Sequence, residues 1–180
     1  QVTTEPAIIQ KGYDGEITII FNPNEGNKGM SGATKCYAHT GLITSASSSD
    51  GDWKNVVEGW RTNTSKTQMT KDGNNWKLVI PNIYEYYKVP TTTEIKKIAF
   101  VFHDGAGGSK EGKTAEGKDI FVELADKGLA VSINDFAEIT SLNSKVTLTG
   151  NATVSATLTL KINGETVKTA TGTQLTHEYT

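Results

Sequence analysis

The sequence C-Y-A-H-T-G-L-I-T occupies residues 36–44, and D-W-K-N-V-V-E-G-W follows at residues 52–60 after a loop rich in serine. The first stretch predicts a strand, and alternate side chains of a strand point to opposite faces. Cys36 and Ala38 are both small, and we expect them on the face that packs against the core. The other face then carries rings with polar tips rather than aliphatic side chains.

That other face carries Tyr37 and His39, and the loop at residues 45–52 is long enough to return Trp53 beside them. Three such rings on a solvated sheet form a partly polar platform, on which the C–H faces of a sugar stack. Trp60 is close enough in sequence to add a fourth ring. The alternative is that both tryptophans only cover the edge of the core, since surface rings often serve in packing alone.

The composition excludes several classes of function and favours a β-rich module. The 180 residues carry a net charge of −2 with acids and bases interspersed, so we expect no nucleic-acid partner. No apolar run approaches the roughly 20 residues of a membrane-spanning helix, and the polar first residues do not form a signal peptide. The single cysteine excludes an internal disulfide. Abundant threonine, serine, glycine and asparagine in short alternating runs predict an all-β extracellular module.

Period-2 alternation predicts the strands of a first domain that covers residues 1–130. We expect these strands at residues 7–10, 16–21, 34–44, 66–70, 76–80, 95–104 and 119–124. The apolar run at residues 95–104 predicts the central strand. Trp76 is expected in the core, because it alternates onto one face with Leu78 and Ile80.

Three tyrosines lie close together in residues 82–87, where we expect one helical turn that ends before Pro90. Tyr84, Tyr86 and Tyr87 are expected to pack, because tyrosines often bury the ring and expose the hydroxyl. The alternative is that they form a second contact surface.

The pattern changes near residue 130, and residues 131–180 predict a second domain. Apolar side chains alternate there with polar ones at Val154, Ala156, Leu158, Leu160 and Ile162. Asn163-Gly164 is a type I′ hairpin signal. These strands are typical of an immunoglobulin-like sandwich, which needs about 100 residues, so we expect this domain to be incomplete at Thr180. A smaller sandwich that is complete is the alternative.

No arrangement of catalytic residues is evident, and we expect a non-catalytic chain without a cofactor. His103 and Asp104 are adjacent residues with acid–base character, but no nucleophile accompanies them. No pair of carboxylates has a spacing that singles it out for glycoside hydrolysis. Asp50 and Asp52 are the candidate ligands for calcium, although a solvated acidic turn is the simpler interpretation. Three scattered histidines and one cysteine make zinc less plausible still.

Residues 12–124 resemble the starch-binding carbohydrate-binding modules of families 25 and 26. The motifs of that family occur here in order: E-I-T-I-I-F at residues 16–21, Tyr37 and His39 on one strand, Trp53 in a loop, and G-K-D-I-F-V at residues 117–122. The sequence of residues 7–30 is also similar to the N-terminal region of secreted α-amylases from Bacteroides-type gut bacteria.

The resemblance implies a β-sandwich module that binds starch and maltooligosaccharides and tethers an α-amylase-type glycoside hydrolase to its substrate. It implies that a linker domain of the immunoglobulin type follows the module. It also implies a monomeric chain, covalently linked to the catalytic domain and located outside the bacterium or at its surface, associated with the outer membrane. The ring platform of the family carries over to Tyr37, His39 and Trp53.

We add Trp60 to this predicted site from its position alone. Lys54, Asn55 and Glu58 lie between the two tryptophans, and with His39 they are expected to bond the O2 and O3 hydroxyls of glucose. The alternative function is a cell-surface adhesion or spacer module, in which the same rings form the centre of a protein interface.

Overall fold

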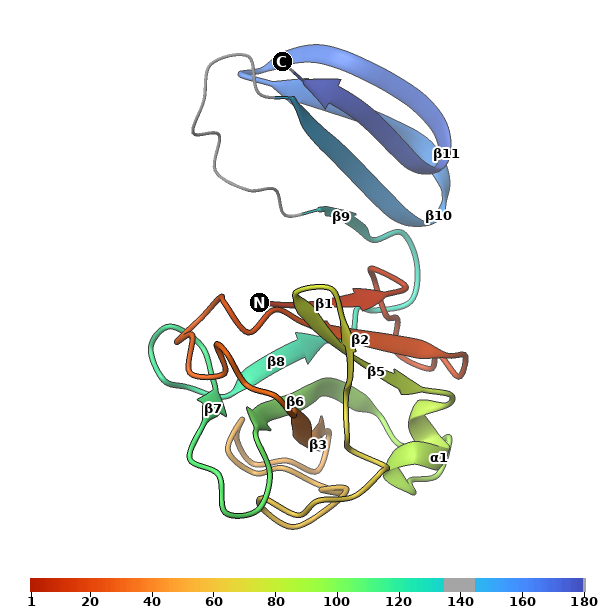
Figure 1. Cartoon of the computed structure of the whole chain (residues 1–180). Coiled ribbons are helices and arrows are strands. Elements are labelled where there is room, and N and C mark those ends of the chain that lie inside the picture. Colours follow the sequence, from red (N-terminus) through yellow and green to blue (C-terminus); the bar gives the residue numbers. More distant parts are fainter. Residues whose placement is uncertain (135–144, 180) are drawn as a thin grey trace. The chain divides into compact units, whose positions relative to one another are not determined.

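The structure is a computed structural model that describes residues 1–134 and 145–179 (Figure 1). It confirms the all-β, sandwich-like class expected from the sequence. The chain forms two compact units, Gln1–Ala125 and Asp126–Thr180, which divide a few residues before the expected boundary. Residues 135–144 and 180 of the predicted second domain lie outside the described residues, and the immunoglobulin-like character of that domain stays a prediction.

Two antiparallel sheets make up the first unit (Figure 1). The first sheet has the spatial order β1 (Val2–Glu5), β2 (Ile17–Phe21), β5 (Asn75–Ile80) and β4 (Thr70–Asp72). The second sheet is built on β6 (Ile95–His103), which pairs with β3 (Tyr37–Thr44) along one edge and with β7 (Glu111–Gly112) and β8 (Ile120–Glu123) along the other. The most apolar strand is therefore central, as predicted.

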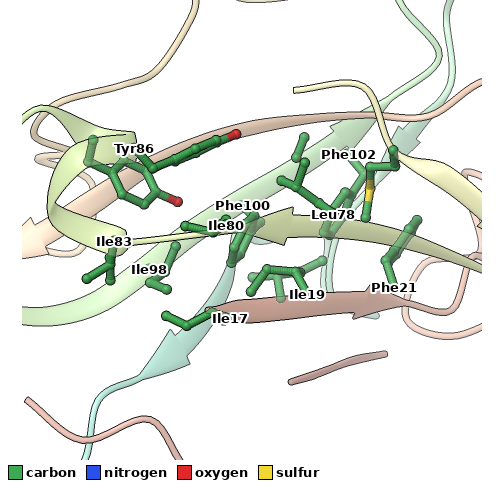
Figure 2. Close-up of a cluster of buried hydrophobic side chains, with 14 of the residues drawn as sticks. Ile17, Ile19, Phe21, Leu78, Ile80, Ile83, Tyr86, Ile98, Phe100 and Phe102 are labelled. Carbon is green, nitrogen blue, oxygen red and sulfur yellow. The ribbon is translucent and has the colours of Figure 1, made fainter. Parts of the chain in front are cut away.

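The core of this unit lies between the two sheets, where alternate residues of β2 face β6 (Figure 2). The ring of Phe21 stacks on Phe102 of β6, with a centroid distance of 3.9 Å and an interplanar angle of 12°. Phe100 continues the stack, with its ring parallel to that of Phe102 at 5.6 Å. Cys36, Ala38 and Trp76 are buried, which confirms their predicted place in the core.

The tyrosine-rich stretch forms the short helix α1 (Ile83–Tyr87), as its spacing predicts. The side chain of Asn82 caps the N-terminus by accepting hydrogen bonds from the backbone N–H groups of Tyr84 and Glu85. The hydroxyl of Tyr87 lies 2.7 Å from the hydroxyl of Thr40 inside the core. All three tyrosines are buried, so their rings pack as expected.

Two predicted strands are wrong in position. The first strand is β1, not residues 7–10, because the chain leaves the sheet at Pro6, which has no N–H to donate to the ladder. The strand expected at residues 66–70 instead divides between the two sheets. The carbonyl of Thr67 accepts from Ala38 of β3, the N–H of Met69 donates to Cys36 just before β3, and β4 begins only at Thr70.

The second unit contains the sheet β9 (Val131–Ile133), β10 (Val146–Ile162) and β11 (Glu165–Tyr179), with β10 in the middle. Asn163 and Gly164 both have positive φ, at 52° and 87°, as the predicted hairpin turn requires. The inward alternation holds from Ala156 onward. Val154 is exposed instead, because the pairing register shifts between Asn151 and Ala156.

Candidate functional site

The loop after β3 returns along the free edge of that strand and thereby places Trp53. Leu42 and Lys54 exchange two backbone hydrogen bonds of 2.8 and 2.7 Å, and Val57 donates to the carbonyl of Thr40. A Cβ atom at position 41 would lie 3.1 Å from the Lys54 carbonyl oxygen, so glycine permits this close approach. The edge of β3 is thus occupied by the segment that carries both surface tryptophans.

Five rings gather on the outer face of β3 and the end of β6, and we call them the ring cluster: Tyr37, His39, Trp53, Trp60 and His103. Trp53 stacks on His39 with centroids 5.6 Å apart and planes 27° apart. Trp60 meets the same imidazole edge-on, at 5.1 Å and 83°. Trp60 also lies edge-on to His103 at 5.2 Å, and His103 stacks on Tyr37.

The rings of the cluster differ greatly in their accessibility. Trp60 is 46% exposed, and Trp53 and His39 are half-buried. Tyr37 is only 4% exposed and His103 1%. The expectation of Tyr37 as an open platform ring is therefore wrong for this conformation, because His103 and the loop at Gly105 cover it. The accessible surface consists of Trp53, Trp60 and part of His39.

The predicted polar residues surround these open rings. The ammonium of Lys54 forms an ion pair with Asp52, with 2.7 Å between Nζ and Oδ1. Asn55 is exposed and has a φ of 49°, which turns the chain between the tryptophans. Glu58 is half-buried, and its backbone lies against His39. All seven predicted site residues thus belong to one neighbourhood of the first unit.

The pKa of each histidine in the cluster lies below the ordinary value of an imidazole, which favours the neutral form. Burial lowers the pKa of His39, although a hydrogen bond with the Glu58 backbone opposes the shift. Burial and the nearby positive charge of Arg61 lower the pKa of His103 to about 4. Since the backbone N–H of Gly105 donates to Nδ1 of His103 at 3.0 Å, the proton of the neutral imidazole lies on Nε2.

No known protein family and no curated protein matches this sequence. The geometry of the site is therefore the basis for any assignment. Within residues 1–134 and 145–179 no helix is long and apolar enough to cross a membrane.

The acidic turn before Trp53 has its carboxylates engaged with lysines. Asp50 pairs with Lys97 at 3.1 Å. The ammonium of Lys54 and the N–H and hydroxyl of Ser48 lower the pKa of Asp52 to about 2. In the described part of the chain, no group of three or more potential ligand side chains could hold a metal ion. Calcium binding at this turn stays an untested alternative to the expected solvated acidic turn.

His103 and Asp104 have structural roles in this conformation. The imidazole of His103 is buried beneath the loop that begins at Gly105, which is the arrangement that a packing role predicts. Asp104 pairs with Arg61, with 2.9 Å between Oδ1 and the guanidinium nitrogen. Burial raises the pKa of Asp104, but the hydrogen bonds from Arg61 and the Lys110 backbone have the larger opposite effect. The pKa of Asp104 therefore lies below its ordinary value.

Sequence reasoning did not place His103 and Arg61 beside the rings. The residue pairing of β3 with β6 sets His103 opposite Tyr37, which only the register of the sheet reveals. Arg61 has one signal in the sequence, because it is the only arginine in the chain and directly follows Trp60.

Burial of His103 predicts a specific dependence of stability on pH. Its pKa is about 4 when folded and 6.5 in the unfolded reference, so the unfolded state binds more protons between these values. Stability therefore falls as the pH drops below 6.5. We expect the loss between pH 6.5 and 4.5 to be about 2 kcal/mol larger in the wild type than in His103→Asn.

Urea unfolding at several pH values tests this expectation, with tryptophan fluorescence as the signal. All three tryptophans belong to the first unit, so the signal reports that unit alone. Asparagine is the suitable replacement, because its side-chain oxygen can accept the bond from Gly105 in place of Nδ1. His39 is present in both proteins, so its contribution to the pH dependence of stability cancels in the comparison. If the free energy of unfolding falls equally with pH in the wild type and in His103→Asn, the lowered pKa of His103 is contradicted.

Proposed function

We propose that the accessible rings of the cluster, Trp53, Trp60 and His39, bind α-1,4-linked glucan, as starch or maltooligosaccharides, without catalysing a reaction. The relative inclination of the two open indoles supports this proposal most strongly. Trp53 lies 27° from the plane of His39 and Trp60 lies 83° from it, so the two indole planes are steeply inclined to each other.

Inclined rings suit a curved sugar chain better than a flat one. An α-1,4-linked glucan curls, so its successive glucose units turn their apolar faces in different directions. A β-1,4-linked chain is nearly flat and fits rings that lie in one plane. The geometry around His39 therefore favours the curved α-glucan as the ligand.

The surroundings of the rings suit a neutral polyhydroxyl ligand. The lowered pKa of His39 favours the neutral form of its imidazole, which lies between the two indoles. Lys54 and Asn55 keep part of their side chains open to solvent beside Trp53. Together with Glu58, these groups can donate to or accept from the O2 and O3 hydroxyls of a stacked glucose.

The expected affinity is low, because few rings are available. An aromatic contact contributes on the order of 1 kcal/mol beyond its buried area, so two open indoles support a Kd of about tens to hundreds of micromolar. Such an affinity becomes useful through avidity, when the module is covalently linked to a catalytic domain that acts on an insoluble polymer. We propose that this linkage, to an α-amylase-type hydrolase outside the bacterial cell, is the context in which the module works.

A protein interface is the second candidate function, and one observation favours it. Val56 is 40% exposed and lies in the same segment as the exposed Trp60, so the surface carries an aliphatic side chain as well as rings. Interfaces are enriched in exposed tryptophan and arginine, and the guanidinium of Arg61 lies over Trp60. An adhesion or spacer module would use this surface without binding a glycan.

Native affinity electrophoresis distinguishes the two functions. We expect the mobility of the chain to fall in gels that contain amylopectin or pullulan, and to be unchanged in gels with dextran or without glycan. Pullulan and amylopectin contain α-1,4 linkages, whereas dextran is chiefly α-1,6-linked. Equal mobility in all four gels would reject the glucan proposal and favour the protein interface.

A further inference from the structure

The chain contains a single arginine, Arg61, and places it directly against the most exposed ring of the cluster. Apart from the three histidines, every other basic residue in the sequence is a lysine. The side chain of Arg61 is only 18% exposed. Its backbone has a φ of 55°, in the left-handed region that non-glycine residues seldom adopt. A side chain this buried, on a left-handed backbone, indicates a specific structural role that a surface lysine would not fill.

The guanidinium of Arg61 binds the segment that follows β6. Nη1 donates to Oδ1 of Asp104 at 2.9 Å and to the carbonyl of Gly105 at 3.3 Å. Nη2 donates to the carbonyl of Lys110 at 3.2 Å and forms an ion pair with Glu111 at 3.5 Å. One side chain thus connects the loop that carries Trp60 to both ends of the loop at residues 104–111.

The same guanidinium lies over the indole of Trp60, with 5.3 Å between Cζ and the ring centroid. The indole meets His39 and His103 edge-on at 5.1 and 5.2 Å. Trp60 is therefore held by a cation and two imidazoles, although nearly half of its surface is exposed. A second bond between the two loops supports this arrangement, because the backbone N–H of Ala106 donates to Oδ1 of Asn63 at 2.8 Å.

Only arginine can satisfy these contacts together. The guanidinium is planar and presents donors in two directions, while its face stays free to stack on an aromatic ring. The ammonium of lysine is a point charge that can bond to some of the same oxygens but cannot also stack as a plane. The use of lysine at every other basic position, apart from the three histidines, makes this distinction meaningful for Arg61.

We propose that Arg61 is the positioning residue that fixes the indole of Trp60 and so sets its inclination to Trp53. This inference rests on the proposed glucan function for its effect on affinity, but its structural part stands independently of any ligand. A prepositioned ring loses less conformational freedom on binding, so Arg61 contributes to affinity through Trp60 rather than through contact with the sugar.

A double-mutant cycle with isothermal titration of maltoheptaose tests the effect on affinity. We expect Arg61→Lys to weaken binding by about three- to tenfold. In a Trp60→Ala background the same substitution should change affinity by less than about twofold, since there is no ring left to position. Lys77→Gln is the matched control, because Lys77 is an ion-paired basic residue on the other sheet. The affinity of this variant for maltoheptaose should equal that of the wild type.

Fluorine NMR of 5-fluorotryptophan-labelled protein provides a measurement that needs no ligand. The three tryptophans should give three resonances, and a Trp60→Phe variant assigns the one from Trp60. We expect Arg61→Lys to shift and broaden the Trp60 resonance while leaving that of the buried Trp76 unchanged.

Two results would overturn the inference. One is an unchanged Trp60 resonance in Arg61→Lys, and the other is an equal loss of affinity in the wild-type and Trp60→Ala backgrounds. If the wild type binds no maltoheptaose, the proposed function fails, and the fluorine measurement still decides the role of Arg61. If Arg61→Lys also moves the Trp76 resonance, Arg61 is a general stabiliser of the fold and the positioning role is rejected.

Discussion

Trp53→Ala is expected to abolish retention on starch while the first unit stays folded. Trp53 is half-buried, and its indole N–H donates only to the carbonyl of Asp50 at 3.1 Å in the same loop. Removing the indole takes away one of the two open rings, which is also the ring that stacks on His39. We expect at least a tenfold loss of affinity, which places a weak site below detection in an affinity gel.

The fold should survive this change, because the backbone of the segment is held independently of the indole. Lys54 and Val57 keep their hydrogen bonds to β3 in the variant. Tyr179→Ala is the control, since it removes an exposed ring from the second unit. It should migrate like the wild type in every gel. Undiminished retention of Trp53→Ala, with circular dichroism unchanged, would refute the assignment of the site to this surface.

Phe102→Ala is expected to cost about 3–5 kcal/mol of the free energy of unfolding. Phe102 is fully buried and stacks between Phe21 of the opposite sheet and Phe100 of its own strand (Figure 2). Its truncation removes a stacked contact between the two sheets and leaves a cavity that packed aromatic neighbours cannot easily fill. Urea unfolding followed by tryptophan fluorescence measures the change.

Two further variants keep this test interpretable. Phe102→Leu should cost only about 1–2 kcal/mol, so it gives a measurable transition even if the alanine variant does not fold. Val79→Ala should change stability by less than about 0.5 kcal/mol, because Val79 is 48% exposed on the outer side of β5. A loss at Phe102 no larger than at Val79 would show that the stack between the sheets does not stabilise the fold.

The positions of most strands of the first unit along the chain were readable from local patterns. The alternation of Ile17, Ile19 and Phe21 determines which face of β2 is buried, because a strand turns every second side chain to the same side. The turn at Asn163-Gly164 is equally local, since it depends on two adjacent residues. The errors at residues 7–10 and 66–70 arose where the partner strand, not the pattern, decides the pairing.

The candidate site was only partly readable. The residue types and spacing of Tyr37, His39, Trp53 and Trp60 placed four rings in one region, and the structure brings these four together. Their accessibility could not be read in the same way. The burial of Tyr37 depends on His103, more than sixty positions away in sequence, and on the loop that packs over both.

Local patterns in the chain are sufficient to predict the all-β class, the central strand at residues 95–104, and the presence of surface tryptophans after β3. The tertiary structure is needed to see which rings are open, the angle between them, and that Arg61 lies over Trp60 beside the histidines. The physical reason is the range of the interactions. Periodicity and turn chemistry act between neighbours in the chain, whereas the register of β3 on β6 and the contact of two loops join residues that are far apart in sequence.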